Sequence, residues 1–137
     1  MTPIFLDTSY IIALEAADDQ YHEKVLKHWQ KLISRIPLLI TTSYIFNEIV
    51  TFFNTRNLHS KAIEIGNRLL TSPSIKLIHV DEALFYEAWG YLKKHADKSY
   101  SFTDCLSFVL MKRFKIQTAL TFDKHFVQLS YNKFRSV

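Results

Sequence analysis

The stretch SFTDCLSFVLMKR, residues 101–113, decides the fold of this chain. Its spacing predicts a helix that carries Asp104, Phe108 and Met111 on one face. That face is apolar apart from the carboxylate, and an ionised acid directed towards a protein core is costly unless a cation meets it. The stretch therefore predicts a buried cation site, and other acids of the chain should lie beside it.

Three other acids stand in equally apolar surroundings. Asp7 follows the run IFL, Glu48 lies inside SYIFNEIVTFF, and Asp123 follows ALTF. We expect all four acids to converge on one site. Carboxylates about 5 Å apart repel one another by roughly 3 kcal/mol per pair at an effective dielectric near 20. A hard divalent cation, Mg²⁺ or Mn²⁺, removes that repulsion and needs only oxygen ligands.

Length and composition indicate one folded domain over residues 1–137. Hydrophobic residues make up 48% of the chain and aromatic residues 15%, which supports a full core and argues against disorder. A single cysteine cannot form an internal disulfide, so nothing indicates secretion. The first residues lack the pattern of a signal peptide, and no apolar stretch is long enough to span a bilayer. We therefore expect a cytoplasmic protein with no membrane partner.

The charge balance favours an anionic partner. The net charge is +4, from 17 Lys and Arg against 13 Asp and Glu. If four of the 13 acids occupy a metal pocket, nine remain against the 17 cations, an excess of eight positive charges on the periphery. A basic exterior around an acidic, cation-filled cleft suits a ligand with a phosphate backbone, although a modestly basic surface can also serve solubility alone.

Hydrophobic periodicity predicts alternating strands and helices. Strands are expected at 3–7, 38–42, 75–80 and 118–123, and helices at 8–17, 21–35, 43–56, 59–70, 81–98, 103–114 and 124–129. Ser43 is the expected cap of the third helix, and residues 133–137 are expected to add a weak last strand. This order indicates an α/β fold with a four- to five-stranded parallel sheet flanked by helices. Ligands of such sheets bind beyond the carboxyl ends of the strands.

Each acid also has a purely structural interpretation. Three of the four could cap helices, and Asp104 forms with Ser101 the pattern of a capping box. Glu48 lies in the middle of a helix, where a buried salt bridge is the alternative. Asp81 follows a predicted strand in the same way as Asp7 does. We assign Asp81 to a helix cap because its region lacks a second acid in apolar surroundings.

Other reactive residues carry less information. The six histidines show no zinc-binding spacing and are expected on the surface or in the core. Cys105 has no triad context and is expected to be a small core residue. Two glycines nearly exclude a glycine-rich phosphate loop.

Four segments, in this order and spacing, resemble the PIN-domain ribonucleases, particularly the toxins of VapBC toxin–antitoxin pairs. They are FLDTSYIIAL (5–14), SYIFNEIVTFF (43–53), SFTDCLSFVLMKR (101–113) and ALTFDKHF (119–126). The likeness covers essentially the whole chain. It implies a Mg²⁺- or Mn²⁺-dependent endoribonuclease whose products carry a 5′-phosphate and a 3′-hydroxyl. It also implies an antitoxin partner and a homodimer, for which Phe46, Phe52 and Phe53 could supply an apolar patch beyond their use in the core.

The resemblance also assigns roles to individual residues. The family's four catalytic, metal-binding acids match Asp7, Glu48, Asp104 and Asp123, and its supporting hydroxyl positions match Thr8, Ser9 and Thr121. No acid of the pattern is missing.

Three other functions remain open at this point. The chain could be a PIN-domain protein that processes or binds RNA without being a toxin. It could be a receiver-like phospho-signalling domain with Asp81 as the phosphate acceptor. A related DNA 5′-nuclease is a third alternative, but the chain is too short for the helical arch of those enzymes.

Overall fold

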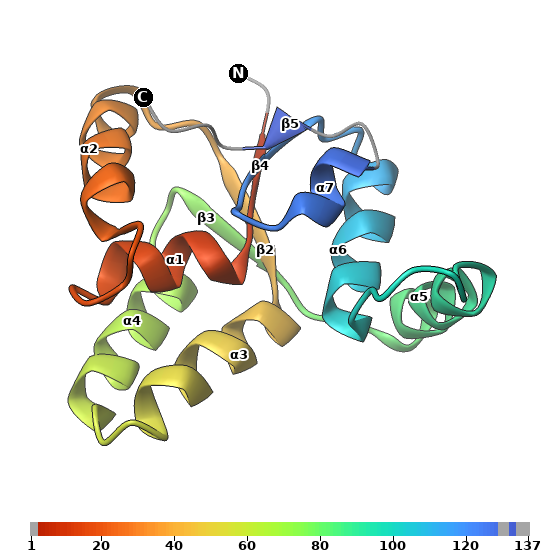
Figure 1. Cartoon of the computed structure of the whole chain (residues 1–137), viewed down its shortest axis with the longest axis horizontal. Helices are drawn as coiled ribbons and strands as arrows, with labels where there is room; N and C mark the ends of the chain where they lie inside the picture. The colour runs from red at the N-terminus through yellow and green to blue at the C-terminus, as the bar shows by residue number, and fades with distance from the viewer. Residues whose placement is uncertain (1–2, 129–131, 134–137) are drawn as a thin grey trace.

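The computed structural model describes residues 3–128 and 132–133, and a parallel sheet lies at its centre (Figure 1). Its strands are β1 (Ile4–Leu6), β2 (Leu39–Thr42), β3 (Ile75–Ile78), β4 (Thr118–Leu120) and β5 (Asn132–Lys133). Every pairing is parallel, and the strand order is β3-β2-β1-β4-β5. The predicted α/β fold with a four- to five-stranded parallel sheet is confirmed.

Helices cover the sheet on both sides. They are α1 (Thr8–Glu15), α2 (His22–Leu32), the 3-10 helix η1 (Ile33–Arg35), α3 (Ser43–Asn54), α4 (His59–Thr71), α5 (Glu82–Lys94), α6 (Phe102–Arg113) and α7 (Lys124–Gln128). Figure 1 shows α1 to α4 on one side of the sheet and α5 to α7 on the other. This arrangement follows from parallel pairing, because each return to the start of the next strand needs a crossover.

The helix that decides the fold is buried almost all round. The sequence predicts one apolar face, but every residue of α6 from Cys105 to Met111 is buried. Phe108 packs edge-on against Phe126 of α7, with ring centroids 4.9 Å apart, and against Tyr91 of α5 at 6.0 Å. Because α6 has neighbours on both of these sides, its polar Ser107 is also enclosed, and its hydroxyl donates to the carbonyl of Thr103 at 3.0 Å.

The strand order places the ends of β1 and β4 next to each other. β1 lies between β2 and β4, whereas β3 lies at the edge of the sheet. From β1 the chain first adds β2 and β3 on one side and later adds β4 and β5 on the other side. Ligands of open parallel sheets bind at the point between the two strands where this direction changes, which here lies between β1 and β4. The receiver-like alternative is wrong, because a receiver places its third strand beside the first and here β2 separates them.

Some local predictions need correction. The expected cap at Ser43 is wrong: Thr42 is the N-cap of α3, and its hydroxyl accepts from the Ile45 amide at 3.2 Å. Thr42 takes this role because it ends β2 with extended backbone angles, whereas Ser43 is already helical. The Ser43 hydroxyl instead accepts from the Val80 amide at 3.0 Å and joins α3 to the end of β3.

Several segments also end differently from the prediction, and the helix expected at 81–98 ends at Lys94. The helix expected at 21–35 is α-helical only to Leu32 and continues as η1 to Arg35. The last strand lies at 132–133 rather than 133–137, of which 134–137 fall outside the described residues.

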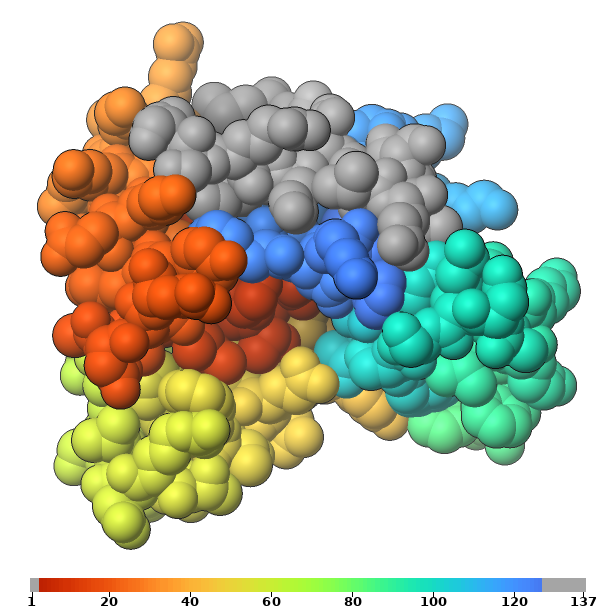
Figure 2. Space-filling view, viewed as in Figure 1, coloured from red at the N-terminus to blue at the C-terminus, as the bar shows by residue number. Residues whose placement is uncertain are grey.

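The exposed aromatic surface lies on α5 and not on α3. Phe53 is buried, and Phe46 and Phe52 pack against the core. Phe85, Tyr86 and Trp89 of α5 are exposed, and Figure 2 shows this helix (teal) on the outer flank of the face in view. Within the described part of the chain, no helix combines the length and the hydrophobicity that a membrane crossing requires.

Candidate functional site

Acids from four segments gather at the carboxyl edge of the sheet. Asp7 directly follows β1, Asp123 lies three residues beyond β4, Asp104 opens α6, and Glu48 lies in the second turn of α3. Figure 2 shows α1 (red), α3 (yellow), α6 (cyan) and α7 (blue) around a recess on the face in view. The recess is thus bordered by the segments that carry these acids.

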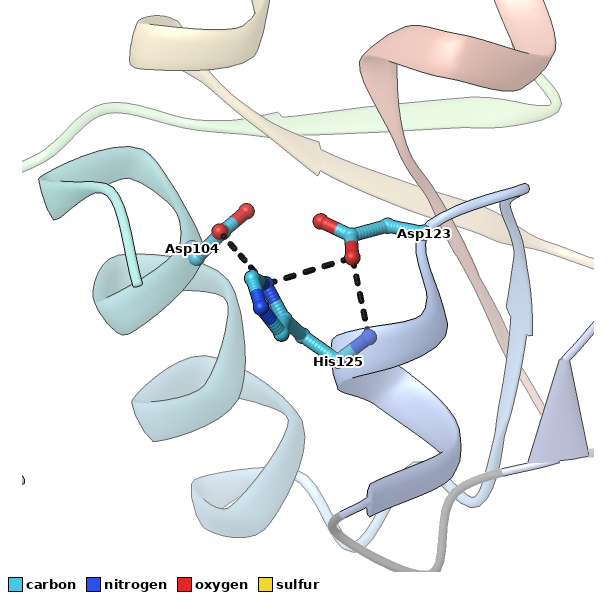
Figure 3. Close-up of side chains that lie close together, drawn as sticks. All are labelled: Asp104, Asp123 and His125. Carbon is cyan, nitrogen blue, oxygen red and sulfur yellow. Dashed lines mark hydrogen bonds and ion pairs between the residues drawn. The ribbon is translucent and has the colours of Figure 1, made fainter. Parts of the chain in front are cut away.

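Asp104, Asp123 and His125 form the tightest cluster of this edge (Figure 3). The Nδ1 atom of His125 lies 3.2 Å from Oδ1 of Asp123 and 3.6 Å from Oδ2 of Asp104. One potential ligand atom from each residue lies within 4.8 Å of the other two. The sequence prediction missed His125, although its place two residues after Asp123, at the start of a helix, was a signal that it would face the same edge.

Asp7 is joined to this cluster through Thr121. The Thr121 hydroxyl donates to Oδ2 of Asp7 at 2.6 Å and accepts from the Asp123 amide at 2.9 Å. The Ser9 hydroxyl also donates to Oδ2 of Asp7, at 3.2 Å, and accepts from the Phe122 amide at 2.9 Å. The Asp7 carboxylate makes no capping hydrogen bond to α1, so a structural role as helix cap does not account for it.

Glu48 is held by the first residue of α1. Its Oε1 accepts from the Thr8 hydroxyl at 2.7 Å, so the residue after Asp7 orients Glu48. The buried salt bridge considered for Glu48 is not found among the described residues. Neither Glu48 nor Asp7 belongs to the 4.8 Å cluster described above.

The site is electrostatically unbalanced. Burial, with a smaller contribution from the charges of Asp104 and Asp123, raises the pKa of Asp7 to about 7, even though the hydrogen bond from Thr121 acts to lower it. Burial, and then the charge of Asp123, also raise the pKa of Asp104. In the part of the chain that the structure describes, no Lys or Arg pairs with these acids. A hard divalent cation fits this set of oxygen donors, since it supplies the missing charge.

Capping and a role in the site coexist at Asp104. Its Oδ2 accepts from the Ser101 amide at 3.2 Å, and the Ser101 hydroxyl accepts from the Asp104 amide at 3.0 Å. This capping box uses one of the lone pairs of the carboxylate, and the others stay available for a cation. Asp81 behaves as predicted: it caps α5 by accepting from the Leu84 amide at 2.8 Å.

Neither the cysteine nor a second cavity offers a competing site. Burial raises the pKa of the Cys105 thiol to about 11, so the residue is a poor nucleophile at neutral pH. A cavity of about 440 Å³ lies among α1, α2, α4 and the start of β3, with a largely apolar lining. Its one acid, Glu15, is paired with Arg68 at 3.0 Å and Lys61 at 3.7 Å. No unbalanced charge remains there to recruit a cation.

Thr121→Val is expected to lower the free energy of unfolding of the metal-free protein by about 1–3 kcal/mol, because the Asp123 amide loses the hydroxyl that it donates to and the Asp7 carboxylate loses the shorter of its two side-chain hydrogen bonds. Urea denaturation at neutral pH measures the effect. Thr51→Val is the matched control, since Thr51 is exposed on α3, and it should change stability by less than about 0.5 kcal/mol. Equal effects of the two changes would contradict the bridging role of Thr121.

The chain is similar in sequence to a known domain family and to a known endonuclease. Residues 4–130 match the model of the PIN domain. The chain is 33% identical over 123 residues to the 23S rRNA-specific endonuclease VapC20 of Mycobacterium tuberculosis, covering 90% of this chain and 91% of the relative.

The chain is also similar in fold to several solved structures. The crystal structure of M. tuberculosis VapC20, described as a sarcin–ricin loop cleaving toxin, superposes with a TM-score of 0.83 at 31% identity, over 93% of this chain and 95% of that one. FitAcB from Neisseria gonorrhoeae gives a TM-score of 0.66 at 21% identity, over 96% of each chain. A toxin–antitoxin complex from Klebsiella pneumoniae gives 0.61 at 9% identity, over 88% of this chain and 87% of that one. The latter two show a shared fold only.

Proposed function

The chain belongs to the PIN-domain family as a VapC-like member, and from this premise we propose that its four acids form the active site of a divalent-metal-dependent endoribonuclease. The observation that carries this assignment is the cluster of Asp104 and Asp123, joined through Thr121 to the buried Asp7, with no Lys or Arg paired to them among the described residues.

The proposed ligands of Mg²⁺ or Mn²⁺ are Asp7, Asp104 and Asp123, with Glu48 bound directly or through a water. When bound, a divalent cation lowers the pKa of coordinated water and offsets the negative charge that develops on a phosphodiester. Thr121 and Ser9 hold the Asp7 carboxylate in one orientation through two hydrogen bonds. Thr8 holds Glu48 at the rim of the same edge. These hydroxyls keep the acids in place before RNA arrives.

The proposed substrate is structured ribosomal RNA. VapC20 is named for its action on 23S rRNA and described as cleaving the sarcin–ricin loop, and 33% identity over 90% of this chain makes that loop the first RNA to test. Hydrolysis by water, rather than attack by the ribose 2′-hydroxyl, should leave a 5′-phosphate and a 3′-hydroxyl.

Cleavage of 23S rRNA in isolated ribosomes tests the proposal. We expect new RNA ends with Mn²⁺ or Mg²⁺ and none with EDTA, because without a cation the carboxylates repel both one another and the phosphate. Ligation of an adaptor that requires a 5′-phosphate maps the ends and identifies their chemistry. Cleavage that continues in EDTA, or ends that carry a 2′,3′-cyclic phosphate, would contradict the proposed mechanism.

The proposal extends to partners and place of action. As a VapC-like toxin, the protein is proposed to act in the cytoplasm and to be inhibited by an antitoxin that covers the acidic recess or inserts a basic side chain into it. We also propose a homodimer, which sedimentation of the purified protein would test. The exposed aromatic residues of α5, Phe85, Tyr86 and Trp89, are a more suitable contact surface for either partner than α3 is.

A further inference from the structure

We propose that His125 is a ligand of the divalent cation through its ring Nδ1 atom, alongside Asp104 and Asp123. The inference rests on the proposed function, since it concerns the same site. It adds a nitrogen donor to a set that is otherwise made only of carboxylates.

The first argument is that Nδ1 of His125 is buried and lacks a hydrogen-bond partner among the described residues. Two carboxylate oxygens lie nearby, at 3.2 Å and 3.6 Å, but neither makes a hydrogen bond with it. Buried polar atoms without a hydrogen-bond partner are rare in folded proteins, and such an atom often binds a water molecule or an ion.

The second argument is the spacing of the three donors. Adjacent ligands of a six-coordinate cation with bonds near 2.1 Å lie about 3 Å apart. The distances from Nδ1 to Asp123 Oδ1 and Asp104 Oδ2 are 3.2 Å and 3.6 Å, and one potential ligand atom of each of the three residues lies within 4.8 Å of the other two. Small side-chain adjustments would therefore bring all three into one coordination sphere.

The third argument is that the surrounding residues fix the imidazole ring. The ring packs against Tyr100 in a T-shaped arrangement, with ring centroids 5.0 Å apart and an interplanar angle of 81°. The backbone amide of His125 donates to Asp123 Oδ1 at 2.9 Å, so the residue is tied to one of its proposed co-ligands. A donor held in this way loses little freedom on binding a cation.

The competing role for His125 is purely structural: the ring would separate the two carboxylates without touching the ion. Pulsed electron paramagnetic resonance of bound Mn²⁺ distinguishes the two roles, because a directly bonded imidazole nitrogen modulates the electron spin echo. We expect a ¹⁴N signal from the wild-type protein that changes to a ¹⁵N signal when only the histidines carry ¹⁵N. This measurement needs no substitution and so does not depend on a variant that folds.

A pair of variants assigns the signal to one histidine. His125→Gln should lose the nitrogen modulation, whereas His59→Gln should keep it, since His59 is an exposed residue of α4 whose Nδ1 pairs with Asn54. His125→Gln should also weaken Mn²⁺ binding by about tenfold or more, and Mg²⁺ binding less, because imidazole favours transition metals over Mg²⁺.

The outcomes separate the inference from the function on which it rests. Mn²⁺ that binds the wild-type protein and supports cleavage without histidine nitrogen coupling would overturn ligation by His125 and leave the nuclease intact. A wild-type protein that binds no Mn²⁺ and cleaves no RNA would overturn the proposed function, and the ligation with it. Coupling that persists in His125→Gln would assign the nitrogen to another histidine and overturn the inference.

Discussion

Asp104→Asn is expected to reduce metal-dependent RNA cleavage by at least about 100-fold, since changes to residues that only support metal ligands already cost 10–100-fold. Asparagine keeps an oxygen that can accept from the Ser101 amide, so the capping box and the fold should survive. What the change removes is one negative charge from the proposed metal site. Single-turnover cleavage of ribosomal RNA at saturating Mn²⁺ measures the loss.

Asp81→Asn is the matched control for this experiment. Asp81 also follows a strand, but its carboxylate caps α5 at the edge of the sheet. Asparagine is as good an N-cap as aspartate, so both stability and cleavage should stay close to those of the wild-type protein. Cleavage by Asp104→Asn at the rate of the control would refute the assignment of the site.

Asp7→Asn is expected to stabilise the metal-free protein above pH 7 while it inactivates the enzyme. Burial raises the pKa of Asp7 from 3.8 to about 7, so between these values the folded state binds a proton that the unfolded state has released. Stability must then fall as the pH rises from about 4 to 7. The loss is complete above pH 7 and is on the order of 4 kcal/mol for a shift of this size.

The comparison of the wild-type protein with Asp7→Asn isolates this effect. Urea denaturation in EDTA at a series of pH values should show no difference in this contribution near pH 4 and a growing advantage of the variant towards pH 8. Mn²⁺ should restore stability to the wild-type protein at pH 8, because an ion that binds only the folded state adds to its stability. A pH-independent difference between the two proteins would contradict a buried, repelled carboxylate at position 7.

The sequence by itself determined the strands and helices and their order along the chain. Apolar runs such as IFL and ALTF are predicted to be buried parallel strands whatever their neighbours are, and the acid that follows each run then stands at a carboxyl end. The same local logic placed Asp104 at the start of a helix and assigned Asp81 to a cap, and both placements are confirmed. Hydrophobic periodicity and helix capping depend on residues that are close together in the sequence, so both can be predicted from the sequence alone.

Only the tertiary structure decided how these acids are held and which groups join them. The strand order brings β1 beside β4, and this pairing lets Thr121 bridge Asp7 and the Asp123 amide. The packing of α7 against α6 brings His125, which follows Asp123 in the chain, to Asp104 of a different helix. The pKa of Asp7 likewise depends on burial by segments far away in the chain. Contacts between distant segments depend on how the helices pack against the sheet. The free energy of that packing comes from residues throughout the core, so no single stretch of sequence predicts it.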